Sequence, residues 1–475
     1  MDALIKSLVQ IAGETGVLTA AADLDAFVTD CRGSYKGDAK CLVRPRSTEE
    51  VAAVVALCTA HSVPIQPQGG NTGLTGASVP YPGEGSVILS LSRMHRVREI
   101  DATNNSMTVE AGCVLADVQR AAIEAGRYYP VSLGAEGSCQ IGGNIATNAG
   151  GTGVLRYGNT RENVLGLEVV LPDATIWHGL RGLRKNNTGF DLKHLFIGSE
   201  GLLGIITAAT LKLHPLNTHN ISTWLAPAGI DAAVELLGVF QAELGPQLSA
   251  FETMNGPQLQ MVLKFMSNPP SPLDPNLPWH ILAEFNCASN EAGLRNSVEQ
   301  ILQTAFSRGL VTDAVIAASE AQRTSMWDLR HNVTDAIKAA GRGISHDIAV
   351  PVSKIPEFLR RITPALEQRF AGVQIIIVGH LGDGNLHFVP VFTNAAWAAF
   401  PDPDAVIDEV HQLTYGVVNE LGGTFSAEHG IGRYLLGEMR QYKSETELSL
   451  MRSIKHTLDP KGLFNPGKVI PQALN

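Results

Sequence analysis

Apolar residues recur along this chain with two different periods, and these periods predict where helices and strands lie. Ser47 followed three residues later by Glu50 makes a capping box, the sequence signature of a helix start. The residues behind it carry an apolar stripe at helical spacing, formed by Val51, Val54, Val55 and Cys58. A second stripe precedes Gly422, a favourable residue after a helix end, and comprises Val406, Val410, Leu413, Val417 and Leu421.

Short apolar runs bounded by turn residues predict strands. They lie at residues 63–67, 86–89, 106–111, 164–171 and 175–177, and a turn at Pro172-Asp173 joins the last two. Further helices are expected at residues 115–125 and, as one or two short segments, before residue 36. Because helices and strands are intermixed throughout, the predicted fold class is α+β.

Two stretches rich in Gly, Asn and Thr, at residues 69–76 and 134–153, suggest a cofactor cradle. Glycine lets the backbone approach a pyrophosphate and lets consecutive N–H groups converge on an anion. Neither stretch has the G-x-G-x-x-G spacing of a dinucleotide fold or the pattern of a P-loop. Simple turns remain the alternative, but ordering two loops of this length is costly, which favours cofactor binding.

The segment from Val378 to Phe388 carries two histidines on either side of an Asp-Gly pair. Asp-Gly between apolar runs predicts a hairpin with a two-residue turn at Asp383-Gly384. This register would pair His380 with His387 and would place Asn385 on the same face. Two imidazoles that face each other with Cβ atoms about 5 Å apart are a natural start for a divalent metal site. A surface turn is the alternative, but the strongly apolar flanks indicate a buried sheet, where imidazoles need partners.

The segment from Gly422 to Gly432 reads as a short strand that ends in a glycine-rich bend. Adjacent side chains on a strand point to opposite faces, so Glu428 and His429 share one site only if the backbone bends. Gly430 and Gly432 permit such a bend. With the hairpin, this segment provides two histidines, one carboxylate and one further histidine. Three ligands with open positions are typical of a catalytic metal site rather than a closed structural one.

Composition narrows the class of protein. The chain has 475 residues with 44% hydrophobic content, which suits an ordinary enzyme with a large core. A net charge of -10 and the lack of a basic run argue against nucleic-acid binding. The six cysteines form no C-x-x-C pair, which is typical of reduced thiols. With no signal peptide and no apolar run of ~18 residues, a cytoplasmic location and no membrane span are expected.

An ordered set of motifs carries a resemblance to a known family. These are residues 66–76 (QPQGGNTGLTG), 141–151 (IGGNIATNAGG), 198–207 (GSEGLLGIIT), 379–387 (GHLGDGNLH), 426–432 (SAEHGIG) and 459–468 (DPKGLFNPGK). From about residue 37 onward the chain resembles the flavin-dependent D-2-hydroxy-acid dehydrogenases of the vanillyl-alcohol oxidase/p-cresol methylhydroxylase superfamily. The most similar members oxidise D-2-hydroxyglutarate or D-lactate. Each motif is modest alone, but the ordered set is specific.

The resemblance implies three regions: an N-terminal helical segment (1–36), a two-subdomain FAD-binding domain (37–216) and a substrate domain with an antiparallel sheet (217–475), whose tail returns to FAD. Relatives with covalent flavin use a His where this chain has Asn71, so non-covalent FAD is expected. The residues expected to bind FAD are Pro67, Gly69, Gly70, Asn71, Thr72, Gly73, Leu74, Gly134, Ser138, Gly142, Gly143, Asn144, Ala146, Thr147, Asn148, Gly151, Gly201, Gly204, Ile206 and Asn465.

By the same resemblance, a divalent metal, Zn²⁺ or Mn²⁺, binds to His380, His387 and Glu428 and holds the substrate's 2-hydroxyl and carboxylate. His429 takes the hydroxyl proton, and a hydride passes from the substrate carbon to flavin N5. Arg330 and Thr334, an i, i+4 pair on one helix, and Asn385 contact the substrate. The reduced flavin then needs an acceptor, namely an electron-transfer flavoprotein, a quinone or a cytochrome. Family members are often homodimers.

The choice of substrate depends on which cations can meet a second carboxylate. Dicarboxylate-specific relatives often carry a Lys where this chain has Ser345, so D-2-hydroxyglutarate requires another cation, such as Arg342 or His346. D-2-hydroxyglutarate is the favoured substrate, and D-lactate, which needs one cation fewer, or a broad range of D-2-hydroxy acids is the alternative. Two further alternatives are an FAD alcohol oxidase that uses O₂ without a metal, and a metal-binding regulatory subunit that takes up no FAD.

Overall fold

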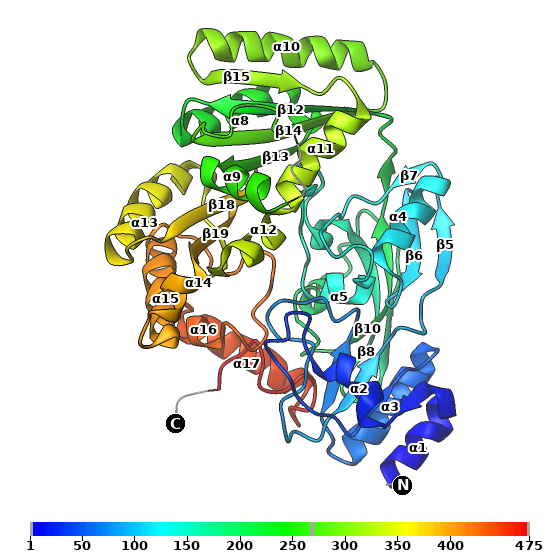
Figure 1. The fold of residues 1–475 in the computed structure, drawn as a ribbon. Helices are drawn as coiled ribbons and strands as arrows, with labels where there is room; N and C mark the ends of the chain where they lie inside the picture. The colour runs from blue at the N-terminus through cyan, green and yellow to red at the C-terminus, as the bar shows by residue number, and fades with distance from the viewer. Residues whose placement is uncertain (1–2, 267–269, 473–475) are drawn as a thin grey trace. The chain divides into compact units, whose positions relative to one another are not determined.

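A computed structural model describes residues 3–266 and 270–472 of the chain (Figure 1). The described chain divides into two compact units. Unit 1 comprises residues 1–151, 158–216 and 428–475, and unit 2 comprises residues 152–157 and 217–427. Within the described residues, no helix combines the length and the apolar character that a membrane crossing requires.

Unit 1 begins with two helices, as expected, followed by a small sheet. The helices are α1 (Ala3–Ala12) and α2 (Ala21–Val28). The sheet has the order β1-β2-β4-β3, formed by β1 (Val17–Leu18), β2 (Cys41–Val43), β4 (Val87–Ser90) and β3 (Ile65–Gln68). Helix α3 (Thr48–Ala60) starts at the predicted cap, because the Ser47 side chain accepts the N–H of Glu50. The predicted apolar stripe of α3 is completely buried.

The second sheet of unit 1 is antiparallel and has the order β5-β6-β10-β8-β9. Its strands are β5 (Val97–Asp101), β6 (Ser106–Glu110), β10 (Ile205–Lys212), β8 (Val164–Val170) and β9 (Ile176–Gly179). The remaining elements of this unit are α4 (Leu115–Glu124), β7 (Arg127–Tyr128), α5 (Ile141–Ala146), α7 (Lys193–Phe196), β11 (His214–Pro215), α16 (Leu436–Tyr442) and α17 (Glu445–Leu458). The second glycine-rich stretch is therefore not all loop, since it contains α5.

Unit 2 is built, in its described part, on one eight-stranded antiparallel sheet. The strand order is β15-β12-β14-β13-β18-β19-β16, and β17 also pairs with β19. The bounds are β12 (His219–Pro227), β13 (Leu248–Asn255), β14 (Trp279–Cys287), β15 (Val311–Ile316), β16 (Arg342–Gly343), β17 (His346–Ala349), β18 (Gln374–His380) and β19 (Asn385–Phe392).

Helices cover both faces of this sheet (Figure 1). One face packs against α9 (Gly256–Phe265), α11 (Glu320–His331) and α12 (Val333–Ala340) through an apolar cluster that includes Met254 and Val378. Phe251, three residues before Met254, points to the opposite face and meets Phe240 of α8 (Ile230–Leu244). The other helices of unit 2 are α6 (Val154–Tyr157), α10 (Glu291–Ser307), α13 (Ile355–Arg369), α14 (Asn394–Ala398) and α15 (Pro403–Glu420).

The hairpin between β18 and β19 differs from the prediction in its register. His380 pairs with Asn385, and His387 pairs with Val378, so four residues (381–384) form the connection instead of two. The predicted two-residue turn is therefore wrong. Because the slip is two residues rather than one, every side chain keeps its predicted face. The His380 and His387 rings lie diagonally on that face, with centroids 5.6 Å apart.

The expected single helix across residues 327–334 is also wrong. Asn332 ends α11 and precedes α12, which places Arg330 on one helix and Thr334 on the next. Arg330 is buried, whereas Thr334 is exposed. The i, i+4 relation that would align the two side chains on one face does not hold here.

Candidate active site

Unit 1 contains a cavity between its glycine-rich segments, and the empty space in and in front of it, open solvent included, is about 660 Å³. It is bounded by the end of β3, the start of α5 and the residues before β10. The lining includes several residues expected to bind FAD, namely Pro67, Gly69, Gly142, Gly143, Ala146, Thr147, Gly201, Gly204 and Ile206. The two glycine-rich segments touch, because a Cβ at Gly70 would lie 2.1 Å from the Ser138 carbonyl oxygen.

The other expected FAD residues lie outside the lining of this cavity: Gly70, Asn71, Thr72, Gly73, Leu74, Gly134, Ser138, Asn144, Asn148, Gly151 and Asn465. Two of them have structural bonds. The Asn71 amide donates to the carbonyl oxygens of Ala26 and Thr29 at 3.1 and 2.8 Å. The Asn465 amide donates to the carbonyl oxygen of Glu200 at 2.7 Å. These bonds tie the glycine-rich segments to α2 and to the C-terminal tail.

The chemistry of the lining suits FAD. Gln68 and Gln140 belong to this lining, and their side-chain oxygens are buried without a hydrogen-bond partner among the described residues. Buried acceptors of this kind need donors, and FAD offers ring N–H, amino and hydroxyl groups. The glycine backbone around them leaves room for a flat ring and a pyrophosphate.

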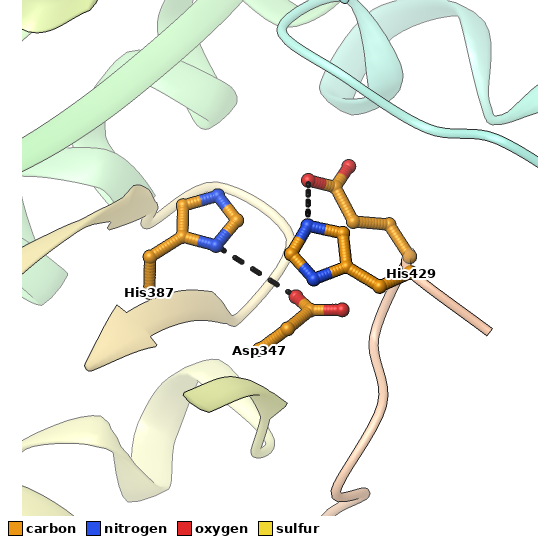
Figure 2. A group of neighbouring side chains, drawn as sticks. Asp347, His387 and His429 are labelled. Carbon is orange, nitrogen blue, oxygen red and sulfur yellow. Dashed lines mark ion pairs between the residues drawn. The ribbon is translucent and has the colours of Figure 1, made fainter. Parts of the chain in front are cut away.

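A second group of chemical side chains gathers around Asp347 (Figure 2). One potential ligand atom from each of Asp347, His387, Glu428 and His429 lies within 4.8 Å of all the others. Asp347 is buried, and the other three side chains are 21–27% exposed, so solutes can reach them. Imidazole nitrogens and carboxylate oxygens are the donor set that Zn²⁺ and Mn²⁺ accept, so these residues fit a divalent metal.

The chain itself brings Glu428 and His429 to this group. Asp347 and His387 belong to unit 2, and Ala427, its last residue, donates its N–H to the backbone and side-chain oxygens of Asp347 at 3.1 and 3.2 Å. The next two residues, Glu428 and His429, thus start beside Asp347. His429 Nε2 lies 3.8 Å from Glu428 Oε1, so the polar ends of these two side chains are neighbours.

The backbone after His429 has the expected bend. Gly430 and Gly432 adopt φ values of 80° and 52°, in the left-handed region that favours glycine. Within unit 1, the buried Glu200 carboxylate accepts the N–H groups of Ile431 and Gly432 at 2.8 and 2.9 Å. Burial raises the pKa of Glu200 to about 7. Because Glu200 also lines the cavity of unit 1, this bond holds the bend against the cavity wall.

His380, the third predicted ligand, is not one of these four residues, although its ring lies beside that of His387. Its Nδ1 lies 2.8 Å from Oε1 of Glu252, the residue paired with it on β13. Oε2 of the same carboxylate accepts the Nε–H of Arg330 at 2.9 Å and forms an ion pair with Nη2 at 2.8 Å. Burial would raise the pKa of Glu252, but His380 and Arg330 outweigh it and lower that pKa.

The other predicted substrate residues are placed as follows. The Asn385 amide donates to Asp347 Oδ1 and to the Ile348 carbonyl oxygen, both at 2.9 Å.

His346 is buried in the core, with its Nε2 2.9 Å from His411 Nδ1. Burial lowers the pKa of His346 well below 6.5, so its ring is neutral. Ser345 and Arg342 are exposed, and Arg342 stacks on Trp397. His346 therefore provides no positive charge for a second substrate carboxylate.

Sequence reasoning missed three acidic residues. Asp347 stands in the short strand β17, where a charged residue among apolar neighbours signals a buried partner. Glu252 gives the same signal in the strand Leu248–Asn255. Glu200 stands inside a recognised motif, but its bonds to residues 431 and 432 span more than 200 positions and leave no local pattern.

Two known protein families match this chain, one in each half. The family described as FAD binding domain matches residues 39–179. The family described as FAD linked oxidases, C-terminal domain, matches residues 219–469, more than half of the chain. The first match contains the part of the cavity lining up to Thr147, and the second contains all four residues of the Asp347 group.

Full-length relatives and solved structures agree with this assignment. A D-2-hydroxyglutarate dehydrogenase from Xanthomonas citri pv. viticola is 37% identical over 98% of this chain and 97% of the relative. A probable mitochondrial D-2-hydroxyglutarate dehydrogenase from Oryza sativa subsp. indica is 38% identical over 98% of this chain and 81% of the relative. The structure of p-cresol methylhydroxylase with substrate bound superposes with a TM-score of 0.73 at 15% identity, over 99% and 96% of the two chains. That likeness shows the two-domain α+β fold.

Proposed function

We propose that this chain, which belongs to the family of FAD linked oxidases, oxidises D-2-hydroxyglutarate to the 2-oxo acid with the help of a divalent metal. The family includes the D-2-hydroxyglutarate dehydrogenases. The chain is accordingly an FAD-dependent oxidoreductase that acts on the CH–OH group of a D-2-hydroxy acid. The observation that carries the metal-assisted reaction is the group of two imidazoles and two carboxylates within 4.8 Å. Such a set is costly to assemble unless a cation or a proton transfer uses it.

We assign FAD binding to the predicted segment 37–216 and substrate and metal binding to 217–475, with the tail around Asn465 supporting the FAD site. The cavity in unit 1 supports the first assignment, as do the amide oxygens of Gln68 and Gln140, which have no partner in the described part of the chain. The Asn71 side chain is engaged with α2, which supports non-covalent FAD, because no nucleophile stands at that position.

His380, His387 and Glu428 would hold the metal, as Zn²⁺ or Mn²⁺. When bound, the metal supplies a Lewis acid that lowers the pKa of the substrate hydroxyl. Asp347 would orient His387 without binding the metal itself. Its Oδ1 lies 3.8 Å from Nδ1 of His387 and accepts an N–H of the Asn385 amide. A carboxylate next to the remote nitrogen of a ligand histidine orients the ring.

His429 would act as the general base. Its Nε2 lies 3.8 Å from Oε1 of Glu428, a proposed metal ligand, and would thus be near a substrate hydroxyl held by the metal. Nε2 takes the hydroxyl proton as the C2–H bond breaks and the C=O bond forms, and the two neighbouring carboxylates stabilise the imidazolium. Bound FAD supplies the acceptor for the hydride that leaves C2.

Arg330, Thr334 and Asn385 would bind the substrate. Arg330 suits a carboxylate because its planar guanidinium donates paired hydrogen bonds. A second candidate substrate, D-lactate, is favoured by one observation. Ser345 is exposed and uncharged, and His346 is buried and neutral, so neither offers a cation for a second carboxylate. Arg342 is the remaining nearby cation of those predicted.

We also propose that the enzyme is cytoplasmic, acts as a homodimer and passes electrons to an electron-transfer flavoprotein, a quinone or a cytochrome. A dehydrogenase needs such an acceptor to complete its cycle. The six cysteines are all free thiols, as reducing conditions require.

The test is anaerobic bleaching of the flavin absorbance with D-2-hydroxyglutarate and D-lactate in parallel, each with and without EDTA. Fast bleaching by D-2-hydroxyglutarate that EDTA abolishes is the expected result. Preference for D-lactate would move the function to the second candidate. Bleaching by simple alcohols that survives EDTA would indicate a metal-free oxidase. A protein that purifies without flavin and takes up none would contradict the enzymatic function.

A further inference from the structure

Glu252 is a fully buried carboxylate that joins two groups with separate roles in the proposed function. Its Oε1 contacts Nδ1 of His380, a proposed metal ligand, at 2.8 Å. Its Oε2 binds Arg330, the proposed carboxylate receptor, through two nitrogens at 2.9 and 2.8 Å. All three residues belong to unit 2, and each side chain is less than 10% exposed.

The identity of its partners fixes the hydrogen positions. Arg330 is always charged, and its ion pair keeps Glu252 ionised, so the carboxylate can only accept hydrogen bonds. His380 must therefore donate from Nδ1. With Nδ1 as the donor to Glu252, Nε2 is the nitrogen through which His380 can bind a metal. A neutral imidazole with its proton on Nδ1 presents a lone pair at Nε2, the form that binds a metal.

The same carboxylate orients Arg330. It engages Nε and Nη2 of the guanidinium, which holds the plane of the group and leaves Nη1 as the nitrogen not bonded to Glu252. A substrate carboxylate would therefore meet a guanidinium of fixed direction whose charge is partly balanced.

We propose that Glu252 is the positioning residue of the site, setting the His380 tautomer for metal binding through Nε2 and the direction of Arg330 for the substrate carboxylate. The proposal rests on the metal site of the proposed function and goes beyond it, because Glu252 touches neither metal nor substrate.

Two substitutions separate this role from simple packing. In Glu252→Gln, the amide oxygen would face Arg330, which only donates, and the amide NH₂ would turn to His380. His380 Nδ1 would then accept, its proton would move to Nε2, and the metal would lose a ligand. Glu252→Asp keeps an acceptor-only group but fits the space less well. If Glu252 only fills space, Glu252→Gln should bind the metal more tightly than Glu252→Asp. If Glu252 sets the His380 tautomer, Glu252→Asp should bind the metal more tightly than Glu252→Gln.

The experiment is calorimetric titration of the metal-stripped, FAD-loaded protein with Mn²⁺ alone, and separately with Zn²⁺. We expect a 10- to 100-fold weaker affinity in Glu252→Gln and a clearly smaller loss in Glu252→Asp. The matched control is Glu284→Gln. Glu284 lies on the neighbouring strand β14 and accepts Arg323 and Trp327 of the same helix, α11, at 2.9 Å each. This control should bind metal as the unmodified protein does.

Flavin absorbance and thermal melting verify that each variant is folded. If Glu252→Gln does not fold, ¹⁵N spectra of the metal-free unmodified protein still decide, because His380 must show a protonated Nδ1. A protonated Nε2, or equal metal affinity in Glu252→Gln and the unmodified protein, would overturn the proposal and leave the proposed function intact. If the unmodified protein binds neither metal, the metal role in the proposed function is wrong, and this inference falls with it.

Discussion

At the scale of single residues, His429 is the group whose loss should separate chemistry from cofactor binding. It does not line the cavity of unit 1, and its Nε2 faces Glu428. We expect His429→Gln to slow flavin reduction by the D-2-hydroxy acid roughly 10²- to 10⁴-fold, the usual contribution of a general base. FAD content should be unchanged. Anaerobic stopped-flow reduction measures both. The control is the same substitution at the exposed His456, His456→Gln. Reduction at the normal rate in His429→Gln would exclude His429 as the base.

The residues that escaped sequence reasoning share one property: their partners are remote in the chain. Glu252 is 128 positions from His380 and 78 from Arg330. His380, His387, Glu428 and His429 lie in recognisable motifs, because glycines and turns mark them locally. Asp347 and Glu252 lie in ordinary strands, where only an unexpected charge gives a sign. Sequence patterns thus locate side chains that sit in turns and bends, whereas the carboxylates that orient them are revealed only by the sheet.

At the scale of elements, the connection between β18 and β19 should be sensitive to any side chain at Gly384. Gly384 has φ 86°, and a Cβ there would lie 2.3 Å from the Val350 carbonyl oxygen. Gly384→Ala should cost about 1–3 kcal/mol and should displace His380 and Asn385, which flank the connection. Gly372→Ala isolates the dihedral penalty, since Gly372 has φ 79° and no atom within 4 Å of the added Cβ.

Chemical denaturation of both variants measures this difference, and metal titration shows whether the hairpin has shifted. Equal losses of stability in Gly384→Ala and Gly372→Ala would mean that the contact with Val350 is unimportant and only the positive φ matters. If Gly384→Ala is the more destabilised of the two yet binds metal normally, the connection supports the sheet without positioning the ligands.

Elements with strong local signals were predicted well, and those that depend on neighbours were not. The capped helix α3 and the strands β8 and β9 match their predicted positions because a Ser cap and a Pro-Asp turn fix them. The hairpin register was wrong because β17 pairs with β19 and β13 pairs with β18, constraints from distant strands. The break at Asn332 has no Gly or Pro to announce it. The slip of two residues preserved the site, since only an odd slip reverses the faces.

At the scale of the whole molecule, buried histidines make stability depend on pH. His280 and His411 both belong to unit 2, and burial lowers the pKa of each to about 4. His280 Nδ1 accepts the indole N–H of Trp224 at 3.1 Å, which requires the neutral ring. The unfolded chain protonates these groups near pH 6.5. Between pH 6.5 and 4 the unfolded state therefore binds more protons, and the free energy of unfolding falls as pH falls.

By this argument, each of the two histidines should cost about 2 kcal/mol of unit 2 stability between pH 7.5 and pH 5. Replacing His280 with Gln retains an acceptor for Trp224 and removes the titrating group. We expect His280→Gln to be less stable than the unmodified protein at pH 7.5, because Gln packs less well, yet to lose less stability on acidification. Urea denaturation of the FAD-saturated protein at half-unit pH steps gives the two slopes. Parallel slopes would show that His280 does not titrate in this window, and the acid sensitivity would then rest on His411 and its neighbour His346.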